Sequence, residues 1–429
     1  CKELSEQSRE IYVEDRSILE YETFVIRVSE RLSFVQSSKD ACVLNRIRGE
    51  DPAQIFGQLE SNGKVFLVSP SGIYFGPEAS VHVGSLIAST LDLSNDDFLK
   101  GRYTFVSEGK NGLIRNEGLI ESLEGSIGFV SSQIENTGSI LAKVGSVSLV
   151  SGDTVTLDFT GEGLMSFSVE GEVKDAVIEQ AGAITSGVIE MKLPLAQRAL
   201  AEIVNLDGES VGDVFVEEAG VIKLVSSSQL IASQTRIEAD ILKIEGSING
   251  SNAEGIGGSI ALVGSKIDLK GALLEVCGKE GGGEVLIGGE FQGQGQTPWA
   301  KSVSMDIESK IYSNATDEGD GGLVVLWASE RTSFEGYVEA KGGALRGSGG
   351  MVETSSQKAL QVDRGKVDTL SPYGATGTWL LDPFFVSIEE TGASCSSLDQ
   401  CGSCSESCTL AVSTINNATS DILIKASAV

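Results

Sequence analysis

The heptapeptide IRNEGLI at residues 114–120 returns 20 residues later as IENTGSI at 134–140. Looser copies follow, IEQAGAI at 178–184 and VEEAGVI at 216–222. Each copy has apolar residues at both ends and a glycine at its fifth position. Self-similarity at a short period indicates a solenoid, in which each unit buries its apolar side chains only against its neighbours.

The later repeats are richer in glycine. GSIALV at 258–263 is echoed by GEVLIG at 283–288, and GLVVLW at 322–327 is echoed by GMVET at 350–354. Short β-branched runs between Gly, Asn and Ser are typical of strands joined by turns. A unit of about 20 residues holds three short strands, which stack in parallel at about 4.8 Å per coil. We therefore predict an all-β fold, a right-handed parallel β-helix (solenoid) from about residue 30 to 388.

One segment departs from this pattern. Residues 193–204 read LPLAQRALAEIV, in which Pro194 suits a first helical turn and the Ala, Leu and Glu content favours a helix. Leu195, Ala199, Leu200 and Ile203 would share one face. The segment predicts one short lateral helix that lies on the rod.

The charge of the chain limits its partners. It has 61 Asp and Glu against 32 Lys and Arg, a formal net charge of −29. Nucleic acid and anionic lipid surfaces would repel such a chain, so we expect no nucleic-acid partner. No apolar run approaches the roughly 20 residues that a membrane-spanning helix needs, so we expect no transmembrane segment.

Candidate catalytic residues are few. The only histidine, His82, lies in an alternating Val-His-Val stretch, which predicts an outward-facing surface side chain. Carboxylates cluster at Asp96-Asp97 and at 317–320, and β-helix enzymes that cleave polysaccharides use such clusters in catalysis or as calcium ligands. The first cluster, however, lies at a loop or helix start and the second in a Gly-rich turn. We predict no catalytic residue, no cofactor and no metal site, and hence no enzyme.

The chain has seven cysteines, of which four lie within 14 residues. Four thiolates at this spacing could bind zinc, but two disulfides that staple a surface loop in an oxidising compartment fit better. The pairing stays open among three possibilities. The disulfide candidates are Cys395, Cys401, Cys404 and Cys408.

Several stretches resemble the haemagglutination-activity domain of filamentous haemagglutinin-like exoproteins of two-partner secretion. They are VLNRI at 43–47 followed by Gly49, IFGQLESNG at 55–63, VFLVSPSGIYFG at 65–76, and ASTLD at 88–92 through Phe98 and Gly101. GGGEVLIGG at 281–289 and GTWLLDP at 377–383 resemble the glycine-rich coils of the same family, so the likeness covers most of residues 10–388. The family's Asn-Pro-Asn-Gly turn is here Ser-Pro-Ser-Gly, which still places Pro and Gly where a β-turn needs them.

The resemblance implies a division of the chain into three parts. These are a haemagglutination-activity domain at 1–160, whose first strands and signal peptide would precede it, a β-helix rod with Gly-rich coils at 161–388, and a Cys-rich loop with the start of further repeats at 389–429. It also implies a secreted protein on the bacterial outer surface. Its export partner would be an outer-membrane barrel transporter whose periplasmic domains read the N-terminal domain. The function implied is that of an adhesin, which binds a receptor or glycan on a host or neighbouring cell.

The best-matching stretch supplies candidates for transporter recognition, namely Asn45, Arg46, Ile47, Ser69, Pro70, Ser71 and Gly72. Asn45 and Arg46 follow an apolar pair, so each must bond the neighbouring backbone or face a partner. In the alternative, structural interpretation, Arg46 holds adjacent coils together through its five donors.

Two other functions remain open. The chain stops inside a strand pattern, ILIKASAV at 422–429, which leads us to expect a longer parent protein. That parent could be the stalk of a contact-dependent toxin or cytolysin whose effector lies beyond residue 429. A β-helix carbohydrate-active enzyme fits the sequence less well.

Overall fold

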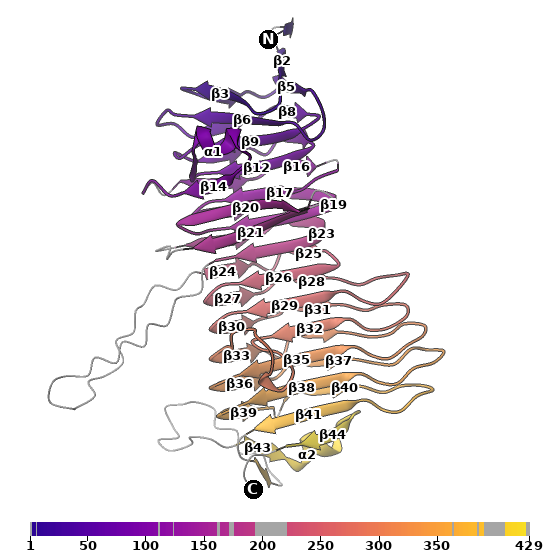
Figure 1. Cartoon of the computed structure of the whole chain (residues 1–429). Coiled ribbons are helices and arrows are strands. Elements are labelled where there is room, and N and C mark those ends of the chain that lie inside the picture. Colours follow the sequence, from indigo (N-terminus) through magenta and orange to yellow (C-terminus); the bar gives the residue numbers. More distant parts are fainter. Residues whose placement is uncertain are drawn as a thin grey trace, which may run out of the picture.

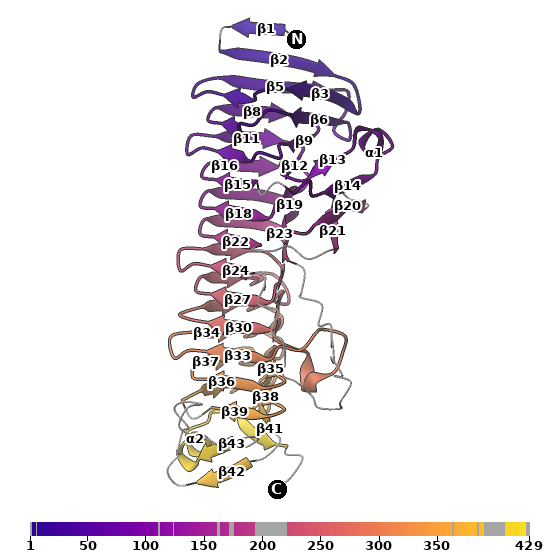
Figure 2. The same cartoon turned by 90° about the vertical axis from the view of Figure 1, so that its left-hand side faces the viewer.

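The repeated isoleucines lie one above another inside the fold. In the computed structural model, parallel strand pairs place Ile114 next to Ile134, Ile134 next to Ile178, and Ile178 next to Ile222. All four are buried, and a fully buried side chain of this size contributes about 1.5–3 kcal/mol. The chain is thus wound into the expected parallel β-helix, drawn along its length in Figures 1 and 2.

The fourth sequence copy was aligned wrongly. Ile178 is stacked on Ile222, not on Val216, so the strand that continues this stack is Val221–Leu224.

The structure describes residues 2–5, 7–109, 112–122, 124–160, 164–170, 176–193, 221–362, 364–383, 386–389 and 408–425.

Each coil crosses three faces, here called face 1, face 2 and face 3, and every face is a stack of parallel strands. Face 1 contains β2 (Ser8–Val13), β5 (Arg31–Gln36), β8 (Gln58–Ser61), β11 (Ser80–Val83), β16 (Leu119–Ser122), the first parts of β19 (Ser139–Val150) and β23 (Ala183–Lys192), β25 (Gln229–Ile231), β28 (Ser247–Asn249), β31 (Leu273–Glu275), β34 (Lys310–Tyr312), β37 (Tyr337–Glu339) and β40 (Lys366–Asp368). Face 2 contains β3 (Ser17–Tyr21), β6 (Cys42–Ile47), β9 (Lys64–Val68), β12 (Ser85–Ser89), β17 (Ile127–Val130), the second parts of β19 and β23, β26 (Gln234–Glu238), β29 (Ser259–Val263), β32 (Glu284–Ile287), β35 (Leu323–Ala328), β38 (Met351–Ser356), β41 (Thr378–Pro383) and β44 (Asp421–Ile424). Face 3 contains β4 (Val25–Ile26), β7 (Ala53–Ile55), β10 (Ile73–Phe75), β15 (Leu113–Asn116), β18 (Gln133–Asn136), β22 (Val177–Gln180), β24 (Val221–Leu224), β27 (Ile241–Ile244), β30 (Lys266–Leu269), β33 (Ser302–Met305), β36 (Arg331–Phe334) and β39 (Ala359–Gln361).

The coils begin earlier than residue 30 and continue past residue 388. Strand β2 already pairs in parallel with β5, and β44 pairs in parallel with β41. Strand β1 (Lys2–Ser5) instead runs antiparallel to β2. Two further strands, β42 (Val386–Glu389) and β43 (Cys408–Ala411), pair with each other in parallel.

The described helices are short. They are α1 (Asn95–Leu99) and α2 (Val412–Asn416), with one 3-10 turn at Phe291–Gly293. The predicted lateral helix at 193–204 lies, after Leu193, outside the described residues. Among the described residues, no helix has the length and apolar character to cross a membrane.

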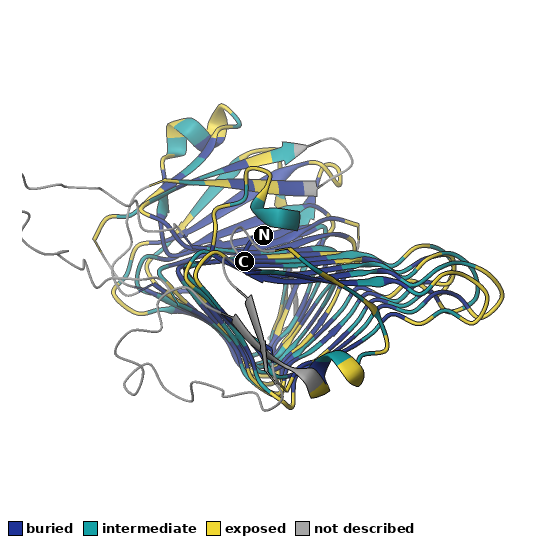
Figure 3. Ribbon diagram, turned by 90° about the horizontal axis from the view of Figure 1, so that it is seen from below, coloured by how far each residue is buried: buried dark blue, intermediate teal, exposed yellow. Residues whose placement is uncertain are grey.

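Five stacked loops project from the corner between faces 1 and 2 in the C-terminal half. These loops, residues 250–258, 276–283, 313–322, 340–350 and 369–377, are here called the fin, and Figure 3 shows them extending to one side. One backbone bond of 2.8 Å closes the base of each loop: Gly258 to Gly250, Gly283 to Val276, Gly322 to Ser313, Gly350 to Ala340 and Gly377 to Thr369, with the first residue of each pair donating its N–H. This close approach explains the glycine pairs in the later repeats.

We expect Gly322→Ala to lower the free energy of unfolding by about 2 kcal/mol, the usual cost of forcing an extra methyl group into a packed site. Its Cβ would lie 2.0 Å from the carbonyl oxygen of Gly283 and 2.1 Å from the hydroxyl of Ser313. Chemical denaturation measures the effect. Gly281→Ala is the matched control, since its Cβ would meet no atom closer than 3.5 Å; equal losses in the two variants would contradict this explanation of the glycines.

A separate antiparallel sheet covers the outer side of face 2 near the N-terminus. It contains β13 (Asp92–Leu93), β14 (Tyr103–Val106), β20 (Thr154–Thr160) and β21 (Leu164–Glu170), in that order. We call it the covering sheet. Between it and face 2 lies a second hydrophobic core, distinct from the one inside the coils; among its members are Leu44, Phe66, Ile87, Phe98 and Phe105.

Candidate functional site

The best-matching stretch forms β6, which is buried on both sides. The side chains of Val43 and Ile47 point into the coil core, whereas Leu44 belongs to the second core beneath the covering sheet. Side chains alternate along a strand. Asn45 therefore faces the interior of the helix, and Arg46 faces the covering sheet.

Asn45 is completely buried inside the coils. The hydroxyl of Tyr21, on the preceding coil, donates to Asn45 Oδ1 at 3.2 Å, and Asn45 Nδ2 donates to the carbonyl oxygen of Phe66, on the following coil, at 3.4 Å. Burial raises the pKa of Tyr21 to about 12, so the phenol stays protonated and remains a donor. Asn45 thus links three successive coils.

Arg46 holds the covering sheet against face 2. Only 4% of the residue is exposed, and its guanidinium forms an ion pair with Asp92 and donates to the carbonyl oxygen of Leu93. Those two residues are strand β13. The alternative role of Arg46 was to join adjacent coils; its observed contacts join face 2 to the covering sheet instead.

The Ser69–Gly72 stretch forms the β-turn that the sequence predicts. The N–H of Gly72 donates to the carbonyl oxygen of Ser69 at 3.0 Å, and Gly72 has a φ of +120° that favours glycine. Ser71 Oγ donates to the carbonyl oxygen of Gly49 on the preceding coil at 3.0 Å. Pro70 and Ser71 are half-buried, whereas Ser69 and Gly72 are buried.

The structure brings the two candidate stretches to the same end of face 2. The strand register pairs Arg46 with Val68, the residue just before the turn. Only Pro70 and Ser71 are partly accessible among the seven candidates, since Ile47 is 1% exposed. The folded domain therefore does not present Asn45 or Arg46 on its surface. Of the two alternatives, each side chain bonds neighbouring backbone in the folded state, at Phe66 and Leu93.

Sequence reasoning missed a buried ladder of amides on face 3. Asn116 Nδ2 donates to Asn136 Oδ1 at 2.8 Å, and Asn136 Nδ2 donates to Gln180 Oε1 at 2.9 Å. Gln180 Nε2 donates to the carbonyl oxygen of Gly182 at 2.9 Å. The signal was present, because these amides occupy the third position of three repeat copies.

His82 is a partly exposed surface residue, as expected. Its ring lies 2.9 Å from the hydroxyl of Ser80 and 3.1 Å from the carboxylate of Glu121 on the next coil. Both ring nitrogens of His82 therefore have partners within the fold.

The carboxylate clusters also have structural partners. Asp97 bonds to Arg102 and to the helix N-cap residue Ser94, and the bonds from Arg102 and Ser94 lower the pKa of Asp97. In the fin, Glu318 pairs with Arg346 at 2.5 Å, and Asp320 accepts the N–H of Ser348 at 2.6 Å. Within the described residues, no three His, Cys, Asp or Glu side chains are placed to hold a metal ion.

The predicted disulfides involve cysteines whose side chains lie outside the part of the chain that the structure describes. Cys395, Cys401 and Cys404 lie outside the described residues, and Cys408 is described only as backbone in β43. Elsewhere, Cys42 is buried and unpaired to another cysteine, and Cys277 is half-buried and likewise free.

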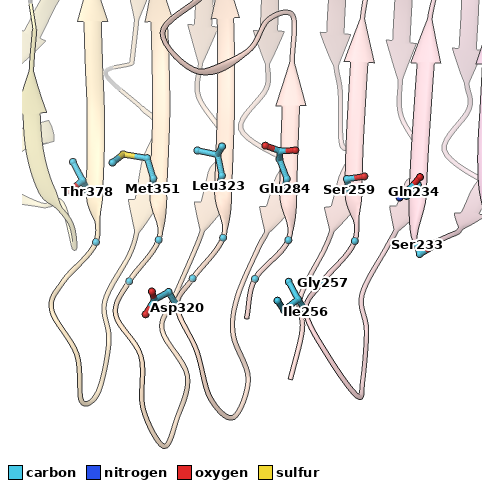
Figure 4. A pocket seen from close by; sticks show the side chains of 18 of the residues that line it. Ser233, Gln234, Ile256, Gly257, Ser259, Glu284, Asp320, Leu323, Met351 and Thr378 are labelled. Atoms are coloured by element: carbon cyan, nitrogen blue, oxygen red, sulfur yellow. The ribbon is translucent and has the colours of Figure 1, made fainter. Parts of the chain in front are cut away.

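A groove of about 810 Å³ runs between the fin and face 2. One wall is a row of side chains from successive strands, seen in Figure 4. The row contains Gln234, Ser259, Glu284, Leu323, Met351 and Thr378. The other wall is made by Ile256, Asp320 and the glycines at the base of the fin. Among the described residues that line this groove, only Glu284 and Asp320 carry a charge, and Glu284 is the only one of the two in the strand wall.

One carboxyl is fully buried on the outer side of face 2. Glu353 lies under the loop that joins β32 to β33, and its Oε2 accepts the N–H of Gln292 at 2.8 Å. Burial raises the pKa of Glu353, because the protein solvates the charged form poorly. The unfolded chain therefore releases this proton at a lower pH than the folded chain does.

This difference gives a pH dependence with a definite sign. The stability that the protonated form contributes is present in acid and is lost as the pH rises from the unfolded pKa through the raised folded pKa. We expect Glu353→Gln to remove this decline in the free energy of unfolding. The decline amounts to about 1.4 kcal/mol for each unit that separates the folded from the unfolded pKa. Denaturation curves across that range measure it. Exposed Glu284→Gln is the control, and a Glu353→Gln profile parallel to the unsubstituted one would contradict the prediction.

The comparisons with known proteins agree on one kind of domain. A family model described as the TPS (two-partner secretion) secretion domain matches residues 9–239. The crystal structure of the HMW1 secretion domain from Haemophilus influenzae matches with a TM-score of 0.64 and 25% sequence identity, over 89% of this chain and 96% of that chain.

Two curated relatives are each named heme/hemopexin-binding protein, one from Haemophilus influenzae and one from its strain Rd. The first is 31% identical over 105 residues, which are 24% of this chain and 11% of the relative. The second is 27% identical over 191 residues, which are 42% of this chain and 21% of the relative. The chain thus matches about a tenth to a fifth of the length of these relatives.

Proposed function

Because the chain belongs to the TPS secretion domain family, and so is part of a secreted exoprotein that has an outer-membrane transporter as its partner, we propose that this transporter reads the stretch around Asn45, Arg46 and the Ser69–Gly72 turn. The observation that supports this most is the likeness of stretches within residues 43–76 to the family, together with the pairing of Arg46 with Val68, the residue just before the turn, on face 2. Since the folded domain buries Asn45 and Arg46, recognition takes place while this stretch is still extended and unfolded.

A loss of secretion can come from lost recognition by the transporter or from lost stability of the domain, and the experiment has to separate the two. Asn45→Ala and Arg46→Ala both remove buried contacts, so each lowers stability whatever the transporter does. A variant that is destabilised elsewhere is therefore the right comparison. Asn136→Ala serves, because its amide lies in the buried ladder on face 3 and outside the proposed recognition stretch.

We expect the Asn45→Ala, Arg46→Ala double variant to be poorly secreted in cells that contain the transporter, while Asn136→Ala is secreted well. Secretion is measured as the exoprotein in the culture medium against the amount retained in the cells. The stability of both purified proteins is measured in parallel. Normal secretion of the double variant, or an equal defect in Asn136→Ala at equal stability, would refute recognition by this stretch.

We propose further that the whole exoprotein acts as an adhesin. The support is the architecture of this chain. It is a rod with the fin exposed along one corner, and it belongs to a family of secretion domains. Binding of the purified protein to cultured host cells tests this, and failure to bind host or neighbouring cells would contradict it.

A second candidate follows from the names of the two curated relatives, which is binding of heme or hemopexin. The chain has a single histidine, His82, which is already engaged by Glu121 and Ser80. In this candidate a host protein such as hemopexin, rather than heme held by this part of the chain, is the ligand. Retention on immobilised hemopexin without binding to cells would favour it over the adhesin.

A further inference from the structure

The coils near the N-terminus have an apolar outer side that they cannot bury themselves. On face 2, Leu44 is stacked on Phe66, and Phe66 on Ile87, in the outward row of three successive strands. All three are fully buried. Coils of a solenoid bury inward side chains against their neighbours, so these outward ones need a cover from elsewhere in the chain.

The covering sheet supplies that cover, and half of it comes from far downstream. The ring of Phe66 packs against Tyr103 of β14 at 4.9 Å and against Phe159 of β20 at 6.4 Å between centroids. Tyr103 also contacts Phe159, at 5.5 Å. Two segments separated in sequence by two coils thus meet over one residue of β9.

The two halves of the sheet also depend on each other for backbone bonds. Strand β13 has only two residues, and β14 pairs on one side with β13 and on the other with β20, in the register Tyr103 opposite Leu157. Strand β20 in turn pairs with β21 along its whole length. A two-stranded piece is marginally stable in water, so β13 and β14 lack a stable sheet until β20 and β21 are in place.

Face 2 is shaped to receive this late segment. Gly128 of β17 lies under β21, where a Cβ would come within 2.9 Å of the Phe167 ring and 3.3 Å of the Met165 methyl group. The gap left by glycine is filled by these two side chains of β21.

We propose that the covering sheet is a folding lock: the inward core of the first coils forms as their residues become available, and the outer core closes only after β20, paired with β21, has joined β14. The lock is a property of the chain and goes beyond the export partner proposed above. It makes completion of the N-terminal coils depend on a contact that is distant in sequence, which is slower to form than contacts between successive coils.

A native thiol reports on the lock. Cys42 of β6 is 5% exposed, and its sulfur lies 3.8 Å from the hydroxyl of Tyr103 in β14. Burial raises the pKa of Cys42, which further slows its reaction with alkylating reagents. Cys277 lies in the fin, so it serves as an internal reference in the same protein.

The test is pulsed alkylation and pulsed hydrogen exchange during refolding of the whole chain, both read by mass spectrometry of individual peptides. We expect β6 and β9 amides to become protected first. Protection of the Cys42 thiol should follow later, together with the β14 and β20 amides. If Cys42 becomes protected with the β9 amides, before β20 is protected, the outer core does not wait for β20 and β21 and the proposal is overturned.

Variants in β20 sharpen the test. Leu157 is buried in the second core and Asp158 beside it is exposed. Leu157→Ala is expected to slow protection of Cys42 by about tenfold while the β9 amides keep their rate, and Asp158→Ala should change neither. Leu157→Val replaces the Ala variant if that one does not reach the native state. An unchanged Cys42 rate in a folded Leu157 variant would also overturn the proposal.

Discussion

Arg46→Ala is expected to lower the free energy of unfolding by about 3 kcal/mol, among the largest effects of any single substitution in this domain. The change leaves the Asp92 carboxylate and the Leu93 carbonyl oxygen without their donor beneath the covering sheet. Removing one partner of a buried ion pair costs about 3–5 kcal/mol. Asp92 retains some access to water, with 26% of its side chain exposed, which places the expected loss at the low end.

Two further variants test the reason for that loss. Arg48 lies two residues along, and its ion pair with Glu20 is half-exposed on both sides; Arg48→Ala should therefore cost at most about 1 kcal/mol. Arg46→Lys keeps the charge but has no second planar donor, so its stability should lie between those of the other two. Chemical denaturation of the purified proteins gives all three values, and similar losses from Arg46→Ala and Arg48→Ala would show that the buried pair is not important.

Asn136→Leu should destabilise the middle of the rod by about 2–4 kcal/mol. The substitution removes the central rung of the amide ladder and leaves an N–H of Asn116 and the Gln180 Oε1 oxygen buried without this partner. Each buried polar group that loses its partner costs about 1–3 kcal/mol. Leucine has the same branched arrangement of side-chain heavy atoms as asparagine but bulkier methyl groups, so the substitution opens no cavity at this position.

Hydrogen exchange is the best measurement for this variant, because neighbouring coils of a solenoid open locally. Protection should fall most in β15, β18 and β22, whose strands carry the ladder, and little in β33 or β36. Gln133→Ala in the same strand is the control, since Gln133 is exposed. A uniform fall along the rod would show instead that the coils unfold as one unit.

The stacked core was readable from the sequence because each coil repeats the same inward pattern. Ile114, Ile134 and Ile178 are matched in both the repeats and the structure. The fourth match failed because short heptapeptides with a glycine at the fifth position also arise by chance in a chain rich in Gly and Val. Only the inward position, occupied by Ile222, identifies the true continuation of the stack.

The covering sheet was not readable in the same way. Its strands have the same two-residue alternation as strands in the coils, so periodicity does not tell them apart. The available sign was the continuous apolar run of β9, VFLV at 65–68, which predicts a strand buried on both sides. For the same reason the sequence left the role of Arg46 open, since its partner, Asp92, is distant in the chain and becomes a neighbour only after the chain has folded.

The closed bases of the fin loops have a consequence for evolution and for engineering. Because one backbone bond ties the two arms of each loop beside face 2, the path of the coil is fixed at that point and does not depend on what lies farther out. The tips, where residues such as Leu345 and Tyr373 are largely exposed, are therefore free to lengthen, shorten or change sequence with little effect on the rod. The same positions would therefore accept inserted foreign epitopes in a peptide-display scaffold.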